Sequence, residues 1–324
     1  MSMTSACYGE AGSEPAIDMP IEKLQALPLD AKVTYTKLII QRFYVQMHGK
    51  VYVSFSGGKD STVLLDLVRS LYPEVPAVYS DTGLEFPEIR EFVKATPNVE
   101  IVRPERSFRE VIRTEGYPVI SKEVARTICD ARRGKEWSLR QLSKTKEESR
   151  YAQGHYAWLL DAPFPISSKC CNVLKKKPMH DYQMRTGRYP IIGTKGVDST
   201  LRNTMLRKCG EVQHDRCTPL GIWTDDDVWA YIRSKDLPYC PIYDMGWSAT
   251  GCIFCLFGIR YDPDRFLKLK ATHPKQWEYC MRPLDQGGLG MQTVCDFLGV
   301  PSGCNQTNLL EFAKEIERHE SSQD

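Results

Sequence analysis

The chain has 324 residues, and its 43 basic and 41 acidic side chains leave a formal net charge of +2. This length can bury a sizeable core, and the near balance of charges excludes a polycation that binds nucleic acid through net charge alone. No apolar run approaches the roughly eighteen residues of a membrane span, and residues 1–20 resemble neither a signal peptide nor a basic transit peptide. We therefore expect a cytoplasmic protein with no membrane partner and a disordered lead over residues 1–20.

Helical and β-rich segments alternate along the first two thirds of the chain. Apolar spacing predicts one or two helices over residues 21–48 and further helices over 61–72 and 88–95. Short β-rich runs predict strands at 50–55, 77–80, 99–102, 190–193 and 219–223. A further helix is expected to open at Thr224, a capping residue followed by three acids.

This alternation predicts an α/β fold with a doubly wound, mostly parallel five-stranded sheet and helices on both faces. We expect that domain to occupy residues 21–235. A C-terminal helical region, residues 236–324, would follow it and carry a C-x-x-C pair.

Residues 121–160 have a charged, helical pattern with five basic side chains, namely Arg126, Arg132, Arg133, Lys135 and Arg140. A solvated helix face explains them most simply. A patch that contacts the phosphates of RNA or DNA is the alternative.

The strand predicted at 50–55 ends in a glycine turn that leads directly into a helix, with the sequence Ser56-Gly57-Gly58-Lys59-Asp60-Ser61-Thr62. A helix N-terminus presents unpaired N–H groups, and glycines let the backbone close around an anion. Three hydroxyls and one ammonium group add further donors. A glycine pair alone also suits plain packing, but the full string predicts a phosphate site. It is not the Walker loop, which has four residues between its first glycine and Gly-Lys.

The string resembles the pyrophosphate loop of the N-type ATP pyrophosphatases, Ser-Gly-Gly-x-Asp-Ser, which grips the β,γ-phosphates while the α-phosphate is attacked. Three later segments resemble one branch, the phosphoadenylyl-sulfate reductase-like proteins: residues 80–88, 193–202 and 223–239. The resemblance covers about residues 45–260. It implies an adenine nucleotide alpha hydrolase-like fold in which residues 56–62, 81–86 and 193–202 meet at the carboxyl ends of the strands.

The resemblance also implies roles for individual residues. Catalytic positions fall on Lys59, Asp60 and Asp81, the two aspartates as magnesium or ribose contacts. Nucleotide contacts fall on Ser56, Gly57, Gly58, Ser61, Thr62, Thr82, Gly83, Lys195 and Arg202. Lys195 and Asp198 stand where the branch usually has Arg and Glu, so a bidentate guanidinium is replaced by the point charge of an ammonium group.

The twelve cysteines include two close pairs, Cys170 with Cys171 and Cys252 with Cys255. Four thiolates suit either zinc or an iron–sulfur cluster, and buried apolar cysteines are the plainer explanation of each one singly. The resemblance favours a 4Fe–4S cluster, because adenylyl-sulfate reductases with that cluster space Cys-Cys and C-x-x-C by about eighty residues, as here. Zinc is the alternative. Cys209 and Cys217 would be spare ligands or sulfur carriers, and the remaining cysteines structural.

Reductases of this branch need a nucleophilic cysteine in a Glu-Cys-Gly-x-His string, which this sequence lacks. We therefore expect an ATP pyrophosphatase that adenylylates an RNA or DNA acceptor with ATP and magnesium, after which a sulfur donor protein or thiol supplies sulfur with iron–sulfur assistance. Reduction of a sulfonucleotide through Cys209 or Cys217 is one alternative. A non-catalytic adenine-nucleotide-binding accessory subunit is the other.

Overall fold

A computed structural model describes residues 21–145, 147–149, 151–257, 259 and 261–304, so the expected disordered lead lies outside the described residues. The chain divides into two compact units. Unit 1 comprises Met1–Pro104 and Lys176–Thr250, and unit 2 comprises Glu105–Lys175 and Gly251–Asp324. This differs from the expected boundary after residue 235, because each unit is assembled from two separate stretches. No helix in the described part of the chain combines the length and apolar character needed to cross a membrane.

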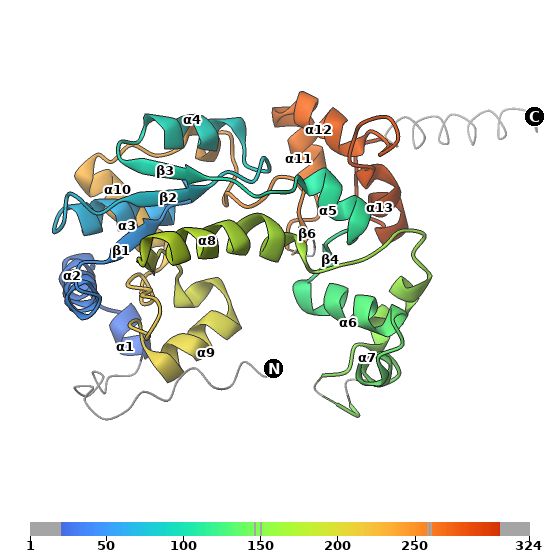
Figure 1. Ribbon diagram of the computed structural model, residues 1–324, viewed down its shortest axis with the longest axis horizontal. Helices are drawn as coiled ribbons and strands as arrows, with labels where there is room; N and C mark the ends of the chain where they lie inside the picture. Colours follow the sequence, from blue (N-terminus) through green and yellow to red (C-terminus); the bar gives the residue numbers. More distant parts are fainter. Residues whose placement is uncertain (1–20, 146, 150, 258, 260, 305–324) are drawn as a thin grey trace, which may run out of the picture. The chain divides into compact units, whose positions relative to one another are not determined.

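Unit 1 contains the main parallel sheet (Figure 1). Its elements in chain order are α1 (Ile21–Gln25), α2 (Leu29–Gln46), β1 (Val51–Ser54), α3 (Lys59–Arg69), β2 (Ala77–Ser80), α4 (Pro87–Ala95), β3 (Val99–Val102), α8 (Lys177–Thr186), β5 (Tyr189–Ile192), the short helix η3 (Gly196–Asp198), α9 (Thr200–Cys209), α10 (Asp225–Lys235) and η4 (Pro241–Tyr243). The alternation of strands and helices expected for the first two thirds of the chain is confirmed.

The sheet has the strand order β3-β2-β1-β5, and all its strands are parallel. Val53 of β1 lies opposite Ala77 of β2 on one side and Ile191 of β5 on the other. From β1 the chain therefore builds outward in one direction through β2 and β3, and β5 is added in the other direction. The order reverses between β1 and β5, which is the position where open α/β sheets bind ligands at the carboxyl ends of their strands.

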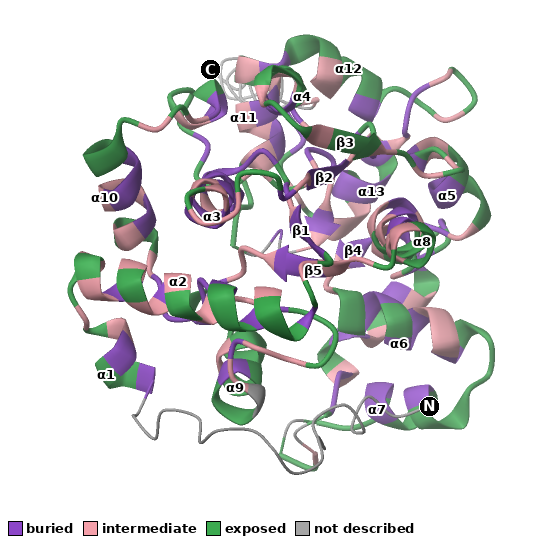
Figure 2. Cartoon of the chain, turned by 60° about the vertical axis from the view of Figure 1, so that its left-hand side comes forward, coloured by how far each residue is buried: buried purple, intermediate pink, exposed green. Residues whose placement is uncertain are grey.

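Helices cover both faces of this sheet, as a doubly wound fold requires (Figure 2). On one face Tyr182 of α8 packs against Tyr52 and Val78 of the two central strands. Because side chains of a strand alternate between faces, Val51 and Val53 face the other side, where α3 lies with α2 and α10. Burial on both faces explains why β1 and β2 consist almost entirely of apolar residues.

The predicted fifth strand at 219–223 is a turn in the structure. Cys217, two residues earlier, forms a single parallel bridge with Ile191, so the described residues contain four strands in this sheet plus one bridging residue. Pro219 lacks an N–H group for a ladder, and Gly221 closes the turn with a hydrogen bond to the Thr218 carbonyl at 3.0 Å. The apolar run of residues 219–223 is buried because it is in the core, not because it is a strand.

Buried polar contacts tie α2 to the turn before α10. The Thr36 hydroxyl donates to the Pro219 carbonyl at 3.2 Å and accepts the Trp223 Nε1–H at 2.8 Å. Lys32 pairs with Asp227 at 2.6 Å, and Asp227 also forms a capping box with Thr224, the predicted N-cap of α10. These contacts hold the start of α10 in place at the edge of the core.

Unit 2 is mostly helical, with a two-stranded parallel pair of β4 (Val119–Ile120) and β6 (Leu256–Phe257). Its other elements are α5 (Phe108–Thr114), α6 (Lys122–Arg132), α7 (Glu136–Leu142), η1 (Gly154–Asp161), the π-helical turn η2 (Asn172–Lys176), α11 (Arg265–Thr272), α12 (Pro274–Met281) and α13 (Met291–Leu298). The charged segment 121–160 thus forms α6, α7 and η1. Arg132 at the end of α6 donates to four backbone carbonyls between residues 159 and 164 and fixes that loop.

Candidate functional site

The turn between β1 and α3 depends on its two glycines. Gly57 has a φ of +72°, and a Cβ there would lie 2.9 Å from Val93 Cγ2 on α4. A Cβ at Gly58 would lie 2.4 Å from Thr250 Oγ1 and 3.1 Å from the Tyr243 hydroxyl. Side chains at either position would force the turn open, so the Gly-Gly pair is needed for its conformation and for close approach of the backbone.

Hydroxyl groups organise the turn from within. The Ser61 hydroxyl donates to the Gly58 carbonyl at 2.9 Å and accepts the Ser56 N–H at 3.2 Å. Ser56 Oγ lies 3.0 Å from Ser61 Oγ and accepts the Gly58 N–H at 3.4 Å. The Thr62 hydroxyl donates to the Gly58 carbonyl at 3.1 Å. These side chains shape the loop in this structure, whereas the sequence predicted them as phosphate donors, a role that stays a prediction.

Two lysine ammonium groups converge beside the N-terminus of α3. Lys59 Nζ lies 2.9 Å from Asp225 Oδ1, and Lys195 Nζ lies 3.2 Å from the same oxygen. Lys195 also lies 2.8 Å from Asp60 Oδ1. The two lysine side chains are only 7% and 2% exposed, so these positive charges are held in a largely desolvated position. The loops after β1 and β5 therefore meet, as expected from the strand order.

Carboxylates keep the buried lysine charged. Burial alone would lower the pKa of Lys195, but Asp60, Asp198 and Asp225 outweigh that effect and raise the pKa above its usual value. The Arg202 guanidinium, at the first turn of α9, pairs with Asp198. Burial alone would raise the pKa of Asp225, yet the ammonium groups of Lys59 and Lys195 lower it. The cluster contains three cations and three carboxylates, all within unit 1.

The sequence missed two members of this cluster. Asp225 was interpreted only as an acid favoured by the dipole of α10, and Tyr243 was not singled out. The Tyr243 hydroxyl accepts the Lys59 N–H at 2.8 Å, which is one of the free donors of α3. The signal for Asp225 was its place inside the family-like segment 223–239, whereas Tyr243 lies just beyond that segment and had no signal of its own.

Asp81, expected to contact magnesium or ribose, is already paired in this structure. Its carboxylate lies 2.9 Å from Arg90 and 3.3 Å from Arg103, and it accepts the Gly83 N–H at 3.3 Å. Burial alone would raise the pKa of Asp81, but the two guanidinium groups lower it. Thr82 donates its hydroxyl to Glu85 at 2.7 Å. These contacts order the turn after β2. A carboxylate that is paired with two guanidinium groups and has a lowered pKa is also a poor general base.

The four predicted cluster cysteines all belong to unit 2. Cys170 Sγ lies 4.0 Å from Cys171 Sγ, and both Cys252 and Cys255 act electrostatically on Cys170. The hydrogen bond from Cys170, helped by Lys122 and Lys175, holds the pKa of Cys171 below its usual value, whereas burial raises the pKa of Cys255 to about 11.

Whether these residues fit a metal centre depends on their chemistry and arrangement. Four nearby thiols, one of them with a lowered pKa, are a donor set that suits zinc or an iron–sulfur cluster. Across the described residues, however, no three Cys, His, Asp or Glu side chains are arranged to hold a metal ion. The donor set therefore fits, and a bound metal would require the thiols to turn toward a common point.

The other cysteines offer no exposed nucleophile with a lowered pKa among the described side chains. Cys217 is fully buried in the sheet edge, and burial raises its pKa well above the usual value. Cys240, Cys280 and Cys295 are buried with raised pKa values as well. Cys7 and the side chain of Cys209 lie outside the described residues. A thiolate attack by Cys217 is thus disfavoured by its burial.

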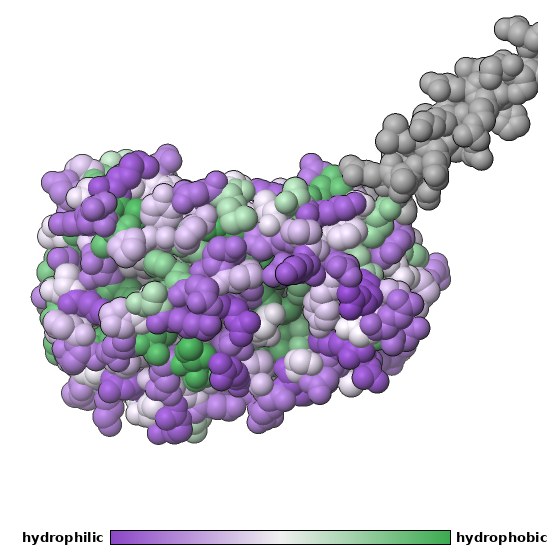
Figure 3. Space-filling view, turned by 90° about the horizontal axis from the view of Figure 1, so that it is seen from above, coloured by the Kyte–Doolittle hydropathy of each residue, from purple (hydrophilic) through white to green (hydrophobic). Residues whose placement is uncertain are grey.

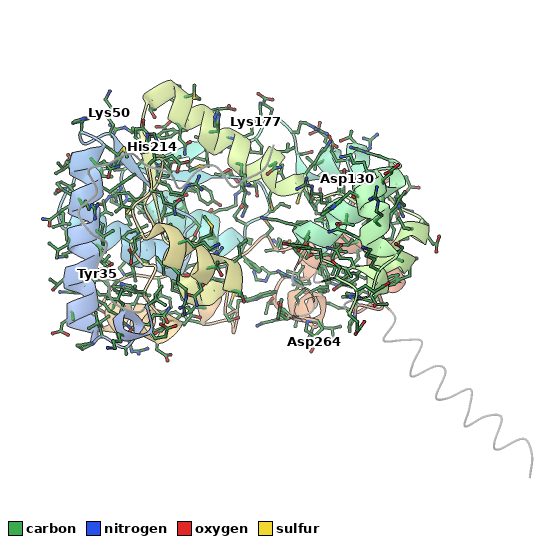
Figure 4. All side chains as sticks on the ribbon, turned by 90° about the horizontal axis from the view of Figure 1, so that it is seen from below. Tyr35, Lys50, Asp130, Lys177, His214 and Asp264 are labelled. Atoms are coloured by element: carbon green, nitrogen blue, oxygen red, sulfur yellow. The ribbon has the colours of Figure 1, made fainter. Side chains whose placement is uncertain are left out.

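The basic residues between Arg126 and Arg140 are largely paired within unit 2. Asp130, labelled in Figure 4, takes contacts from Arg126 at 3.7 Å and Lys135 at 2.7 Å. Arg140 pairs with Glu136, and Arg132 is committed to backbone carbonyls. Figure 3 draws another face of the molecule, seen from above, on which hydrophilic side chains predominate. The structure thus favours the solvated-face interpretation of this segment over a dedicated phosphate patch.

Comparison with known proteins places the chain in a family. A family model of the phosphoadenosine phosphosulfate reductase domain matches residues 50–137 and 120–256. An uncharacterised protein of Methanocaldococcus jannaschii is 27% identical over 79% of this chain and 51% of its own length, so the chain spans about half of that relative. The adenosine 5'-phosphosulfate reductase of Staphylococcus epidermidis is 25% identical over 67% of this chain and 74% of its own length.

A known structure, the U34-tRNA thiolase NcsA from Methanococcus maripaludis with its 4Fe–4S cluster, aligns with 16% identity and a TM-score of 0.38 over 76% of this chain and 75% of that one. The match to the family model covers more than half of the chain and includes both the loop at 56–62 and the four paired cysteines. The protein therefore belongs to the phosphoadenosine phosphosulfate reductase domain family.

Proposed function

We propose that the loop at residues 56–62 binds the triphosphate of ATP and that the protein transfers the adenylyl group to an acceptor. The observation that carries this proposal is the pair of buried ammonium groups, Lys59 and Lys195, beside the Gly-Gly turn and the N-terminus of α3. Backbone N–H groups, a helix dipole and two desolvated cations together suit the highly charged β,γ-phosphates.

The chemistry is a displacement at phosphorus. An acceptor oxygen attacks the α-phosphorus, a new P–O bond forms, and the bond to the β-phosphate breaks, so that pyrophosphate leaves. Lys59 and Lys195 stabilise the charge that builds on the leaving group, and magnesium bound with the ATP would share this role. Asp60, which pairs with both lysines, keeps their charge in place before nucleotide binds.

The second half of the proposed reaction is sulfur transfer to an RNA or DNA acceptor. A hydrosulfide ion supplied by the sulfur donor forms a C–S bond at the activated carbon, the C–O bond breaks, AMP leaves with the acceptor oxygen, and the hydrosulfide proton passes to solvent. Cys170, Cys171, Cys252 and Cys255 would hold a 4Fe–4S cluster that, when bound, supplies a site to bind or activate sulfur.

The test of ATP chemistry is pyrophosphate release from ATP, measured with an RNA or DNA acceptor present. We expect Lys59→Met to abolish release. Lys50→Met is the matched control, because Lys50 is an exposed lysine just before β1 (Figure 4) and should behave as wild type. ATP binding without pyrophosphate release under any acceptor condition would instead indicate a non-catalytic nucleotide-binding subunit.

The test of the cluster is anaerobic purification followed by visible absorption and assays of iron and acid-labile sulfide. About four irons and four sulfides per chain are expected, and Cys252→Ser should lose them while buried Cys240→Ser retains them. Stoichiometric zinc, or no metal, would reject the iron–sulfur assignment.

Reduction of adenylyl sulfate is a second candidate, favoured by the reductases among the relatives. The buried state of Cys217 and the absence of a Glu-Cys-Gly-x-His string argue against it. Sulfite release from adenylyl sulfate with a thiol donor, at a rate unaffected by Lys59→Met, would favour this candidate over ATP chemistry.

A further inference from the structure

Oxygen atoms of the protein itself occupy the position beside the Gly-Gly turn where phosphate binding is proposed. A single oxygen of Asp225 lies 2.9 Å from Lys59 Nζ and 3.2 Å from Lys195 Nζ, bridging two ammonium groups that are otherwise buried. The Asp225 side chain is itself 65% exposed. An exposed carboxylate that reaches inward to two buried cations makes the contacts that a bridging phosphoryl oxygen would make.

A second internal oxygen faces the helix N-terminus. The Tyr243 hydroxyl accepts the Lys59 N–H at 2.8 Å and lies where a Cβ of Gly58 would be 3.1 Å away. Edge-to-face packing against Trp229, with ring centroids 5.3 Å apart, holds the tyrosine in this position. Thr250 Oγ1 lies on the same side of Gly58, where a Cβ would be 2.4 Å away. The donors that an anion needs are therefore already satisfied, by a carboxylate and by hydroxyls.

Helix capping does not explain the position of Asp225. The N-cap of α10 is Thr224, which forms a capping box with Asp227, so Asp225 is not needed to start the helix. Its neighbour Asp226 has the same place in the helix dipole, yet among the described side chains it forms no ion pair with Lys59 or Lys195. Dipole compensation alone therefore does not account for the two ion pairs of Asp225.

We propose that Asp225 and Tyr243 are specificity-determining residues that hold the places of phosphoryl oxygens until a polyphosphate displaces them. This inference rests on the proposed function, since it assumes that the lysines bind phosphate. Nucleotide binding is then an exchange: a ligand gains the ammonium and N–H donors only if it replaces both internal oxygens. A terminal diphosphate presents enough oxygens and charge to do so, whereas a single phosphate or sulfate group does not. The site thereby selects nucleoside triphosphates or pyrophosphate over monophosphates and sulfonucleotides.

The exchange predicts that a substitution at the site strengthens binding. Substituting a residue that binds the ligand would instead weaken it. Asp225 competes with polyphosphate for the ammonium groups of Lys59 and Lys195. Removing its charge should therefore let polyphosphate bind more tightly. Two partly exposed ion pairs correspond to about a fivefold change in dissociation constant. Tyr243→Phe removes the hydroxyl and keeps the ring, and should tighten binding by about twofold to threefold, the smaller effect expected of a neutral hydrogen bond.

The experiment is isothermal titration of the full chain with pyrophosphate and, separately, inorganic phosphate, in low salt and without added metal. Wild type, Asp225→Asn, Tyr243→Phe and the control Asp226→Asn are compared after thermal unfolding shows that each is folded. We expect pyrophosphate to bind the Asp225→Asn variant about fivefold more tightly than wild type, and Asp226→Asn to match wild type. The ratio of phosphate to pyrophosphate dissociation constants should fall in Asp225→Asn.

Each contrary result has a distinct meaning. If wild type does not bind pyrophosphate, the proposed function fails. If wild type binds pyrophosphate but Asp225→Asn binds it equally or more weakly, the exchange inference is overturned while the phosphate site stands. An unchanged phosphate-to-pyrophosphate ratio would overturn the selectivity. If Asp225→Asn does not fold, Tyr243→Phe provides the test. Pyrophosphate binding to Tyr243→Phe that is equal to or weaker than binding to wild type overturns the exchange inference.

Discussion

The buried ammonium of Lys195 allows the clearest quantitative prediction about the candidate site. It lies 2.8 Å from Asp60, 3.1 Å from Asp198 and 3.2 Å from Asp225, with its side chain 2% exposed. Removing one partner of a buried ion pair costs about 3–5 kcal/mol. The three carboxylates are 28%, 25% and 65% exposed, so water relieves part of their repulsion. We therefore expect Lys195→Met to lower the free energy of unfolding by about 2–3 kcal/mol.

Urea unfolding followed by circular dichroism measures this loss, and a double-mutant cycle with Asp60→Asn isolates the pair. The coupling energy should be about 1–2 kcal/mol, because Asp60 is partly exposed. Lys195→Arg keeps the charge and should lose less than Lys195→Met. A loss below about 0.5 kcal/mol for Lys195→Met, the range of ordinary surface substitutions, would refute the argument that this ammonium is desolvated and held by the carboxylates.

Three further predictions concern the framework of the two units. Thr36→Val leaves the buried Nε1–H of Trp223 without its acceptor, so urea unfolding should show a loss of about 2–3 kcal/mol, and Thr36→Ser should recover most of it. The pKa of Asp81 is lowered by its arginine partners, so its contribution to stability is complete above about pH 4 and is lost as the pH falls through the lowered pKa. The difference in unfolding free energy between wild type and Asp81→Asn should therefore be constant at neutral pH and shrink in acid; a difference that grows in acid would contradict the assigned ion pairs. Arg132→Met removes hydrogen bonds to four carbonyls, and hydrogen exchange should accelerate across residues 159–164 while pyrophosphate binding by unit 1 is unchanged.

Local sequence patterns were sufficient for most elements of unit 1. Strand β1 and helix α3 were predicted because a short apolar run, two glycines and a 3.6-residue apolar period are local signals. The predicted N-cap Thr224 is confirmed for the same reason, since a capping box needs only four consecutive residues. The prediction of a strand at 219–223 was wrong because buried turns and buried strands are both apolar, and only hydrogen-bonded pairing with a neighbouring strand distinguishes them.

Local sequence patterns could not predict the division into two units, because each unit combines stretches that are distant in the sequence. Residues 105–175 join residues from 251 onward, so the Cys170–Cys171 pair and the Cys252–Cys255 pair belong to one unit although about eighty residues separate them. Spacing suggested that the four thiols belong together, and the structure places both pairs in unit 2. The choice between zinc and an iron–sulfur cluster at such thiols depends on ligand geometry, which sequence spacing does not encode.

The sequence by itself determined the family and predicted a phosphate loop, because glycines, hydroxyls and a lysine at fixed spacing encode a local backbone shape and its donors. Only the tertiary structure decided which charges surround that loop. Lys195 follows β5 and reaches Lys59 because parallel strands place their carboxyl ends at one edge of the sheet, whereas Asp225 reaches both lysines from the first turn of α10, after the buried turn at 219–223. An ion pair between such residues depends on distances that strand order sets, and no local pattern records those distances.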